Sequence, residues 1–115
     1  MSNKREIGRR GEEQVADYLR GRGYIILARN FYYGHREIDI IALKDRTVAF
    51  VEVKSRSTDR FGTGLESVTP GKIRHIVSAA RYFLHRRGYR HHSVRFDVAS
   101  LDGNRLRYVK DAFHP

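Results

Sequence analysis

The 115-residue sequence contains no cysteine and no tryptophan, and only two prolines and one methionine. Without cysteine there are no disulfides, thiolate zinc sites or cysteine nucleophiles, which fits a reducing compartment. No apolar run is long enough to cross a membrane, and the N-terminal residues lack the apolar stretch of a signal peptide. We therefore expect a cytoplasmic protein in which residues 1–115 form a single domain, because a chain of this length buries one core but not two.

Acidic residues are scarce relative to basic ones. The chain has 13 Asp and Glu against 23 Lys and Arg, which gives a formal net charge of +10 and a pI near 10.4. A well-solvated surface would carry charge too, but an excess of this size favours a polyanionic partner. The six histidines show no paired metal-ligand spacing on a helix, which argues against a histidine zinc site, and no P-loop or dinucleotide fingerprint is present.

Two adjacent apolar stretches carry most of the predicted core. Glu37–Leu43 and Thr47–Lys54 read as β-strands buried on both faces, and Lys44-Asp45-Arg46 between them suits a hairpin turn. Three carboxylates and one amine interrupt these runs: Glu37, Asp39, Glu52 and Lys54. Because side chains alternate across a strand, we expect Glu52 and Lys54 to share one face, and Glu37 and Asp39 to share one face of the neighbouring strand.

Two of these acids raise a question of charge compensation. Asp39 and Glu52 lie inside core strands, where an unpaired carboxylate is strongly destabilising. Lys54 alone cannot neutralise both. A divalent ion can, because Mg²⁺ takes one or two carboxylates together with waters and substrate phosphate oxygens.

The order of the predicted elements indicates an α/β domain. A first helix and a strand at Tyr24–Tyr33 precede the two core strands, and a second helix begins at Pro70 after the N-cap Thr69 and runs to about Arg87. A strand at Val94–Leu101 and a last one near Arg105–Lys110 form a terminal hairpin. In the former, Arg95 and Asp97 are better explained as a structural ion pair than as catalytic groups. We expect a central mixed β-sheet flanked by two helices.

An Asp on one strand followed by Glu-x-Lys on the next resembles the PD-(D/E)xK motif of restriction-endonuclease-like folds. A longer set of matches resembles the YraN-like family of small bacterial proteins within that superfamily, and it covers nearly the whole chain. These matches lie at Gly8–Glu13, Asn30-Phe31, Glu37–Ala42, Phe50–Arg56, Val68–Lys72, Arg95–Val98 and Lys110–Phe113. Two positions depart from the usual pattern, since Ile38 replaces the motif proline and Arg36 stands where the family usually has glycine.

The resemblance implies a single αβββαβ endonuclease-like domain and a metal-dependent nuclease acting on phosphodiesters, with DNA favoured and branched or processed DNA among the candidates. Asp39 and Glu52 would hold Mg²⁺ or Mn²⁺, and Lys54 would position the attacking water and stabilise the developing charge. Glu37 is a candidate acid behind these ligands. Branch-cutting relatives act as dimers, so a homodimer is a candidate assembly. The alternative is a nucleic-acid-binding module that keeps the fold but does not cut.

Glu12 is the fourth candidate at the site. It lies on the apolar stripe of a helix predicted from about Ile7 to Arg22, whereas Glu13 lies on the flank. On spacing alone, a role at the site and a helix-start acid that complements the macrodipole are equally supported. Related nucleases bring a catalytic Glu from the first helix to the metal, and Glu12 is the matching position.

Four basic residues are candidates for nucleic-acid contact: Arg36, Arg56, Arg60 and Lys72. Arg56 and Arg60 belong to a long stretch without apolar periodicity, and such loops are usually functional or mobile. Lys72 lies in the first turn of the second helix, where a cation opposes the helix dipole, so a phosphate partner and a simple surface position are equally supported. The aromatic and basic stretch Tyr32–Arg36 is predicted as a loop that stacks bases or packs on the core.

Overall fold

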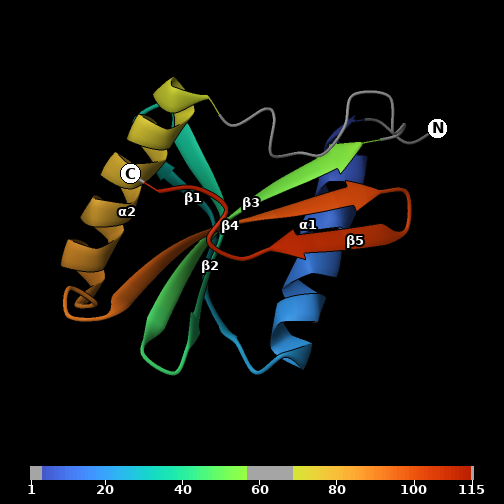
Figure 1. Ribbon diagram of the computed structural model, residues 1–115. Coiled ribbons are helices and arrows are strands. Elements are labelled where there is room, and N and C mark those ends of the chain that lie inside the picture. The colour runs from blue at the N-terminus through green and yellow to red at the C-terminus, as the bar shows by residue number, and fades with distance from the viewer. Residues whose placement is uncertain (1–3, 57–68, 115) are drawn as a thin grey trace.

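A computed structural model of the protein describes the backbone of residues 4–56 and 69–114, and the side chains of 10–55 and 69–114. A five-stranded mixed sheet with strand order β1-β2-β3-β4-β5 is flanked by two helices (Figure 1). The elements in chain order are α1 (Lys4–Gly21), β1 (Ile25–Tyr33), β2 (Arg36–Lys44), β3 (Thr47–Arg56), α2 (Pro70–Arg87), β4 (Ser93–Asp102) and β5 (Arg105–Val109). The predicted α/β class and αβββαβ order are confirmed.

The sheet is antiparallel except at one junction. Strands β1, β2 and β3 form a meander, β3 pairs with β4 in parallel across the α2 crossover, and β5 returns antiparallel to β4. Each helix covers one face, so the sheet is buried on both sides, which explains the near-continuous apolar runs of β2 and β3. The α1 face is built from Val15, Ala16, Leu19, Tyr24, Ile40, Ala42, Ala49, Val51, Ala99 and Leu101, and the α2 face from Ile38, Ile41, Val48, Phe50, Ile76, Ala79, Ala80, Phe83 and Phe96.

Helix α2 begins and ends where its sequence predicts. The Thr69 hydroxyl accepts a hydrogen bond from the Lys72 backbone N–H at 3.2 Å, and Pro70 occupies the first turn. Gly88 adopts a left-handed conformation with φ of 80° and donates its N–H to the Leu84 carbonyl, which ends the helix. The other helix starts earlier than predicted, at Lys4 rather than near Ile7.

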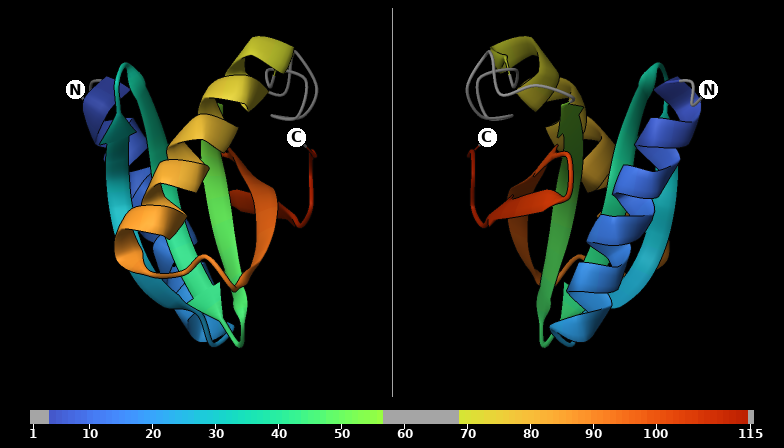
Figure 2. Two further views of the ribbon diagram at one scale, coloured as in Figure 1. Left: turned by 90° about the vertical axis from the view of Figure 1, so that its left-hand side faces the viewer. Right: turned by 90° about the vertical axis from the view of Figure 1, so that its right-hand side faces the viewer.

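Strands β2 and β3 separate partway along their length. Their pairing runs from the turn only as far as Ile40 opposite Val51, whereas β3 stays paired with β4 up to Arg56. Figure 2 shows the two strands diverging from their shared hairpin toward the end of the molecule where both helices begin. We call the point where β2 and β3 separate the fork. Beyond it, backbone groups of β3 no longer pair with β2. The carboxylates within the apolar runs of these two strands lie here.

The regular alternation of side chains breaks in β2 at the fork. Ile38 packs with α2 and Ile40 packs with α1, although they are two residues apart. Asp39 lies between them, and Asn30 on the neighbouring strand has a left-handed φ of 51°. Ile38 packs with α2, whereas Glu37 and Asp39 meet Glu12 of α1. The alternation therefore holds from Glu37 to Asp39, as predicted, and is lost between Asp39 and Ile40.

Helix α1 approaches the sheet closely because Gly11 has no side chain. A Cβ atom at this position would lie 2.5 Å from Ser55 Oγ and 2.9 Å from Leu101 Cδ1. The close approach places the next residue, Glu12, at the fork. No helix within the described ranges is long and apolar enough to cross a membrane.

Candidate functional site

The Asp39 carboxylate occupies the fork between β2 and β3. Its Oδ2 accepts a hydrogen bond from the Val53 backbone N–H at 2.8 Å, and the residue is only 9% exposed. Val53 lies beyond the last β2–β3 pair, so its amide is available to a side chain rather than to the β2 backbone. The separation of the strands therefore both makes room for the acid and supplies its backbone donor.

Three carboxylates from two elements meet at this point. One oxygen from each of Glu12, Glu37 and Asp39 lies within 4.8 Å of the other two. Like charges at such separations repel strongly in a partly desolvated environment. A group of three carboxylate oxygens this close is able to hold a metal ion, and hard divalent cations prefer oxygen ligands.

Asn30 holds two of these acids in place. Its Nδ2 donates to Glu12 Oε1 at 2.9 Å and to Glu37 Oε1 at 3.4 Å. The left-handed φ of 51° at Asn30 is tolerated by asparagine better than by most residues. The sequence matched Asn30 to the family without assigning it a role, so its function as a positioning residue is a finding of the structure.

Burial and crowding of negative charge both act on Asp39. Desolvation is the main cause that raises its pKa to about 9, and the charge of nearby Glu52 acts in the same direction, while the Val53 amide opposes it. Burial also raises the pKa of Glu52, opposed first by the charge of Lys54. In the absence of a cation, Asp39 therefore retains a proton that ordinary acids lose well below neutral pH, and the pKa of Glu52 is shifted in the same direction.

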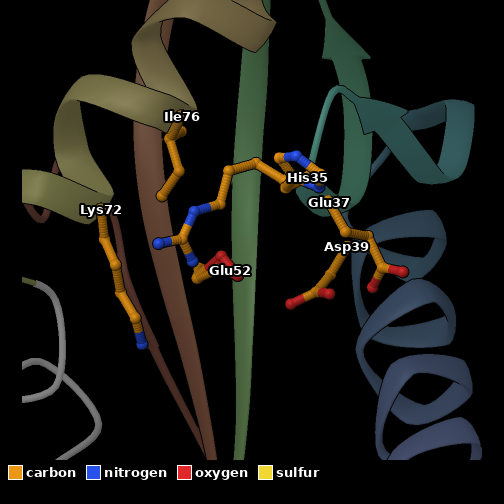
Figure 3. A pocket seen from close by; sticks show the side chains of 7 residues that line it. His35, Glu37, Asp39, Glu52, Lys72 and Ile76 are labelled. Carbon is orange, nitrogen blue, oxygen red and sulfur yellow. The ribbon is translucent and has the colours of Figure 1, made fainter.

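Positive side chains line the same cleft as the acids. A cleft of about 240 Å³ is lined by His35, Arg36, Glu37, Asp39, Glu52, Lys72 and Ile76. Figure 3 shows Lys72 reaching from α2 toward the side where Glu52 lies, with Glu37 and Asp39 opposite. The charge of Lys54 lowers the pKa of Lys72, which means that two ammonium groups approach each other here. Such a pair is favourable when an anion lies between its members.

The structure places the sequence-predicted residues in two groups. Glu12 and Asp39 lie in the tight carboxylate group with Glu37, which was expected only behind the ligands. Glu52 lies beside Asp39 across the fork, close enough to couple with it electrostatically, but it is not one of those three. Lys54 lies beside Glu52, as the alternation in β3 predicts.

Two of the four basic residues predicted to contact nucleic acid have side chains within the described residues. Arg36 and Lys72 line the cleft. Arg36 belongs to β2, and Tyr32 and Tyr33 belong to β1, so the predicted aromatic loop shrinks to a turn at Gly34-His35. Arg60 and the side chain of Arg56 lie outside the described residues.

Glu13 points away from the site. It forms ion pairs with Arg29 and Arg20 on the exposed flank of α1, and the Arg29 contact lowers its pKa. Val15, Ala16 and Leu19 are fully buried on the stripe that Glu12 shares. The predicted difference in orientation between Glu12 and Glu13 is therefore confirmed.

A second buried carboxylate serves the fold. Asp97 is fully buried and accepts hydrogen bonds from Arg95 at 2.9 Å, from the Tyr108 hydroxyl and from the Asp111 N–H at 2.9 Å. These contacts join β4 to β5 and the C-terminal segment. The predicted Arg95–Asp97 structural ion pair is confirmed.

Comparison with known proteins finds a family match over most of the fold. Residues 11–101 match the family described as "Uncharacterised protein family UPF0102". The chain belongs to the UPF0102 family. The matched segment starts at Gly11, one residue before Glu12, and includes Glu37, Asp39, Glu52 and Lys54.

UPF0102 relatives align over most of their own length. A UPF0102 protein of Clostridium perfringens strain 13 is 42% identical over 115 residues, covering 95% of this chain and 94% of the relative. One from Persephonella marina is 40% identical over 106 residues, with 92% and 91% covered. A third, from Prosthecochloris aestuarii, is 46% identical over 96 residues, with 84% and 76% covered.

Proposed function

We propose that the protein is a metal-dependent nuclease that hydrolyses phosphodiester bonds in nucleic acid, with DNA as the favoured substrate. The observation that carries the proposal is the convergence of Glu12, Glu37 and Asp39 at the fork, beside a cleft that Glu37 and Asp39 line together with Arg36 and Lys72. Three acids held this close are costly unless a cation joins them. The resemblance of Asp39, Glu52 and Lys54 to the PD-(D/E)xK motif supports the same reading.

The carboxylates would hold Mg²⁺ or Mn²⁺. Glu12, Glu37 and Asp39 form the tightest group, and Glu52 lies beside Asp39 as a further oxygen donor. An ion bound there would make a water nucleophilic at neutral pH and reduce the repulsion between these acids and a phosphate. The residues fit this role because all four are oxygen donors suited to hard cations.

The cations of the cleft would bind the substrate phosphate. Lys72 and Arg36 line the same cleft as Asp39 and Glu52, and Lys54 approaches both Glu52 and Lys72. Lys54 would orient the water that attacks phosphorus and stabilise charge on the phosphate oxygens as it develops. A chain with a net charge of +10 adds attraction over a longer range.

The test separates binding from chemistry at two positions on β3, Glu52 and Lys54. Glu52→Ala should bind duplex DNA in chelator as well as or better than the parent, because an acid that repels phosphate is gone, yet it should lose Mn²⁺-dependent cleavage. Lys54→Met should also stop cleavage, but its binding should be equal or weaker because a cation is lost. Binding is measured by fluorescence anisotropy in chelator and cleavage on gels in Mn²⁺, with circular dichroism to check folding.

The second candidate function is a binding module that keeps the nuclease fold without cutting, and the net charge of +10 favours it as far as binding goes. Linear, single-stranded, flapped and four-way DNA are each incubated with parent protein in Mn²⁺. If the parent cleaves none of them but binds with an affinity that falls steeply with salt, by a log–log slope of about −0.9 per phosphate contacted, the binding module replaces the nuclease. Cleavage by folded Glu52→Ala at the parent's rate would place the active site elsewhere.

A further inference from the structure

Two tyrosines form an exposed aromatic surface at the outer side of the sheet. The rings of Tyr33 on β1 and Tyr82 on α2 have centroids 4.8 Å apart with planes inclined by 35°. Tyr33 is 42% exposed and Tyr82 is 44% exposed. Single exposed aromatic residues are common, but this pair presents a joined π surface to solvent.

The core beneath this surface holds it in place. Phe31 lies 6.2 Å from Tyr82 between ring centroids, and it also packs edge-on against the fully buried Phe83 at 5.2 Å. The two tyrosines thus come from a strand and a helix whose relative position the core fixes. A platform of this kind needs little ordering when a flat ligand stacks on it.

The tyrosine pair is adjacent to the cleft. Tyr33 is the direct cross-strand partner of Arg36, which lines the cleft, and only Gly34-His35 separates the two along the chain. Directly opposed residues of antiparallel strands lie about 5 Å apart and point to the same face. A strand of nucleic acid whose phosphate enters the cleft therefore passes within reach of Tyr33.

The charge around Tyr82 suits the same ligand. Helix α2 contains no acidic residue. His75, Ser78, His85 and Arg86 are all exposed and lie three, four or seven residues from Tyr82, which places them on the same side of the helix. Aromatic side chains interleaved with basic ones are the usual arrangement for binding single strands, with cations along the backbone and rings against the bases.

We propose that Tyr33 and Tyr82 stack an unpaired base of a DNA strand that enters the cleft, so that the substrate class is DNA with a single-stranded segment rather than uninterrupted duplex. This inference rests on the proposed nuclease function for its biological meaning, but the stacking itself does not require cleavage. Bases inside a duplex have both faces covered by their neighbours, so only an unpaired base offers a free face to the rings.

The test compares binding of two DNA forms in chelator. Fluorescein-labelled oligothymidylate should bind the parent more tightly than a duplex of equal length. Tyr33→Leu and Tyr82→Leu should each weaken oligothymidylate binding by about tenfold and leave duplex binding within about twofold, whereas Tyr33→Phe and Tyr82→Phe, which keep the ring, should bind like the parent. Leu variants that are folded and bind oligothymidylate like the parent would overturn the proposal.

A second measurement uses the parent protein alone. Oligothymidylates that each carry one 2-aminopurine at a different position are mixed with the protein. The fluorescence of a 2-aminopurine that stacks on a ring should be quenched, and the Phe variants should preserve the quenching. Absence of quenching at every position of the probe would overturn the proposal even if the Leu variants failed to fold. A parent dimer that Tyr82→Leu converts to a monomer, with oligothymidylate binding unchanged, would assign the surface to a contact between copies and also overturn it.

These measurements are independent of catalysis. Quenching and a loss of binding in the Leu variants, found together with a parent that does not cleave in Mn²⁺, would support the stacking surface and reject the nuclease. Cleavage without quenching would retain the nuclease and reject the stacking surface.

Discussion

Two buried aspartates, Asp39 on β2 and Asp97 on β4, show how the same residue serves different ends in one sheet. Asp97 accepts hydrogen bonds from Arg95, Tyr108 and the Asp111 backbone, so every partner it needs is built into the chain. Asp39 accepts from one backbone donor, the Val53 N–H, and the side chains that shift its pKa most, Glu52, Glu37 and Glu12, are all acids.

The difference lies in where the compensating charge comes from. Asp97 is neutralised within the fold, and its burial helps to join β4, β5 and the C-terminal segment. Asp39 is left with a raised pKa of about 9 by its burial and by Glu52. Strongly perturbed groups in a cleft are characteristic of functional sites, because a purely structural position is relieved of such a cost by a partner in the chain.

Asp97→Asn should cause the largest change in stability, and it tests the structural role of Asp97 in the comparison with Asp39. The variant places an amide N–H₂ among groups that already donate, and it removes the charge that pairs with Arg95. We expect a loss of about 3 kcal/mol in the free energy of unfolding, measured in urea with chelator near neutral pH.

Asp17→Asn is the matched control, because the ion pair that Asp17 forms with Arg20 is exposed. That change should alter stability by less than about 0.5 kcal/mol. If Asp97→Asn is as mild as this control, the buried network does not stabilise the fold in the way described.

Asp39→Asn should change the free energy of unfolding in the opposite direction and by a smaller amount. In chelator at neutral pH we expect it to stabilise the protein by about 1–3 kcal/mol. The amide oxygen can still accept from the Val53 N–H, and the folded protein no longer has to keep a proton that the unfolded chain releases at neutral pH. In the parent, the pKa of Asp39 is raised from 3.8 to about 9. Its contribution to the free energy of unfolding is therefore fully present below pH 3.8 and is lost as the pH rises toward 9.

Urea unfolding of parent and variant across that pH range, in chelator, measures this difference directly. Parent stability should fall more steeply with pH than that of Asp39→Asn. A variant that is less stable than the parent above neutral pH, with the same slope, would show that Asp39 is compensated within the fold as Asp97 is.

Gly11→Ala tests how Glu12 reaches Asp39, and its effect should be about 1–2 kcal/mol of destabilisation. The added methyl group would overlap Ser55 and the core residue Leu101, so α1 must shift away from the sheet. Gly21→Ala, at the end of the same helix, is the control, since a Cβ there meets nothing within 4 Å. Equal thermal stability of the two variants would show that close approach at Gly11 is not required.

Much of the fold could be predicted from the sequence because local rules and packing agree in most of it. The cap at Thr69-Pro70, the apolar stripe beneath Glu12 and the Arg95–Asp97 pair all follow from spacing and residue type. The candidate acids were recognisable because charged residues inside apolar strands have few structural explanations.

The rest depends on a local departure from regular strand geometry. The alternation rule assumes an unbroken pleat, but Ile38 and Ile40 pack on opposite faces, and Asn30 has a left-handed backbone. The sequence signal for this was weak, consisting of an asparagine within an otherwise ordinary strand. It conceals the role of Asn30 in holding Glu12 and Glu37. The meeting of Glu37 and Asp39 was predictable, because the alternation holds between these two residues.

The central claim is that the acids at the fork form a site for a divalent cation, and a titration of Mn²⁺ into the metal-free protein by calorimetry tests it most directly. The parent should bind Mn²⁺ and release protons on binding, which is seen by comparing buffers of different protonation enthalpy, because the pKa of Asp39 is raised without a cation. Glu12→Gln should weaken binding by at least about tenfold, whereas Glu13→Gln, on the flank of the same helix, should bind like the parent. No binding by the parent, or equal binding by the two variants, would contradict the account.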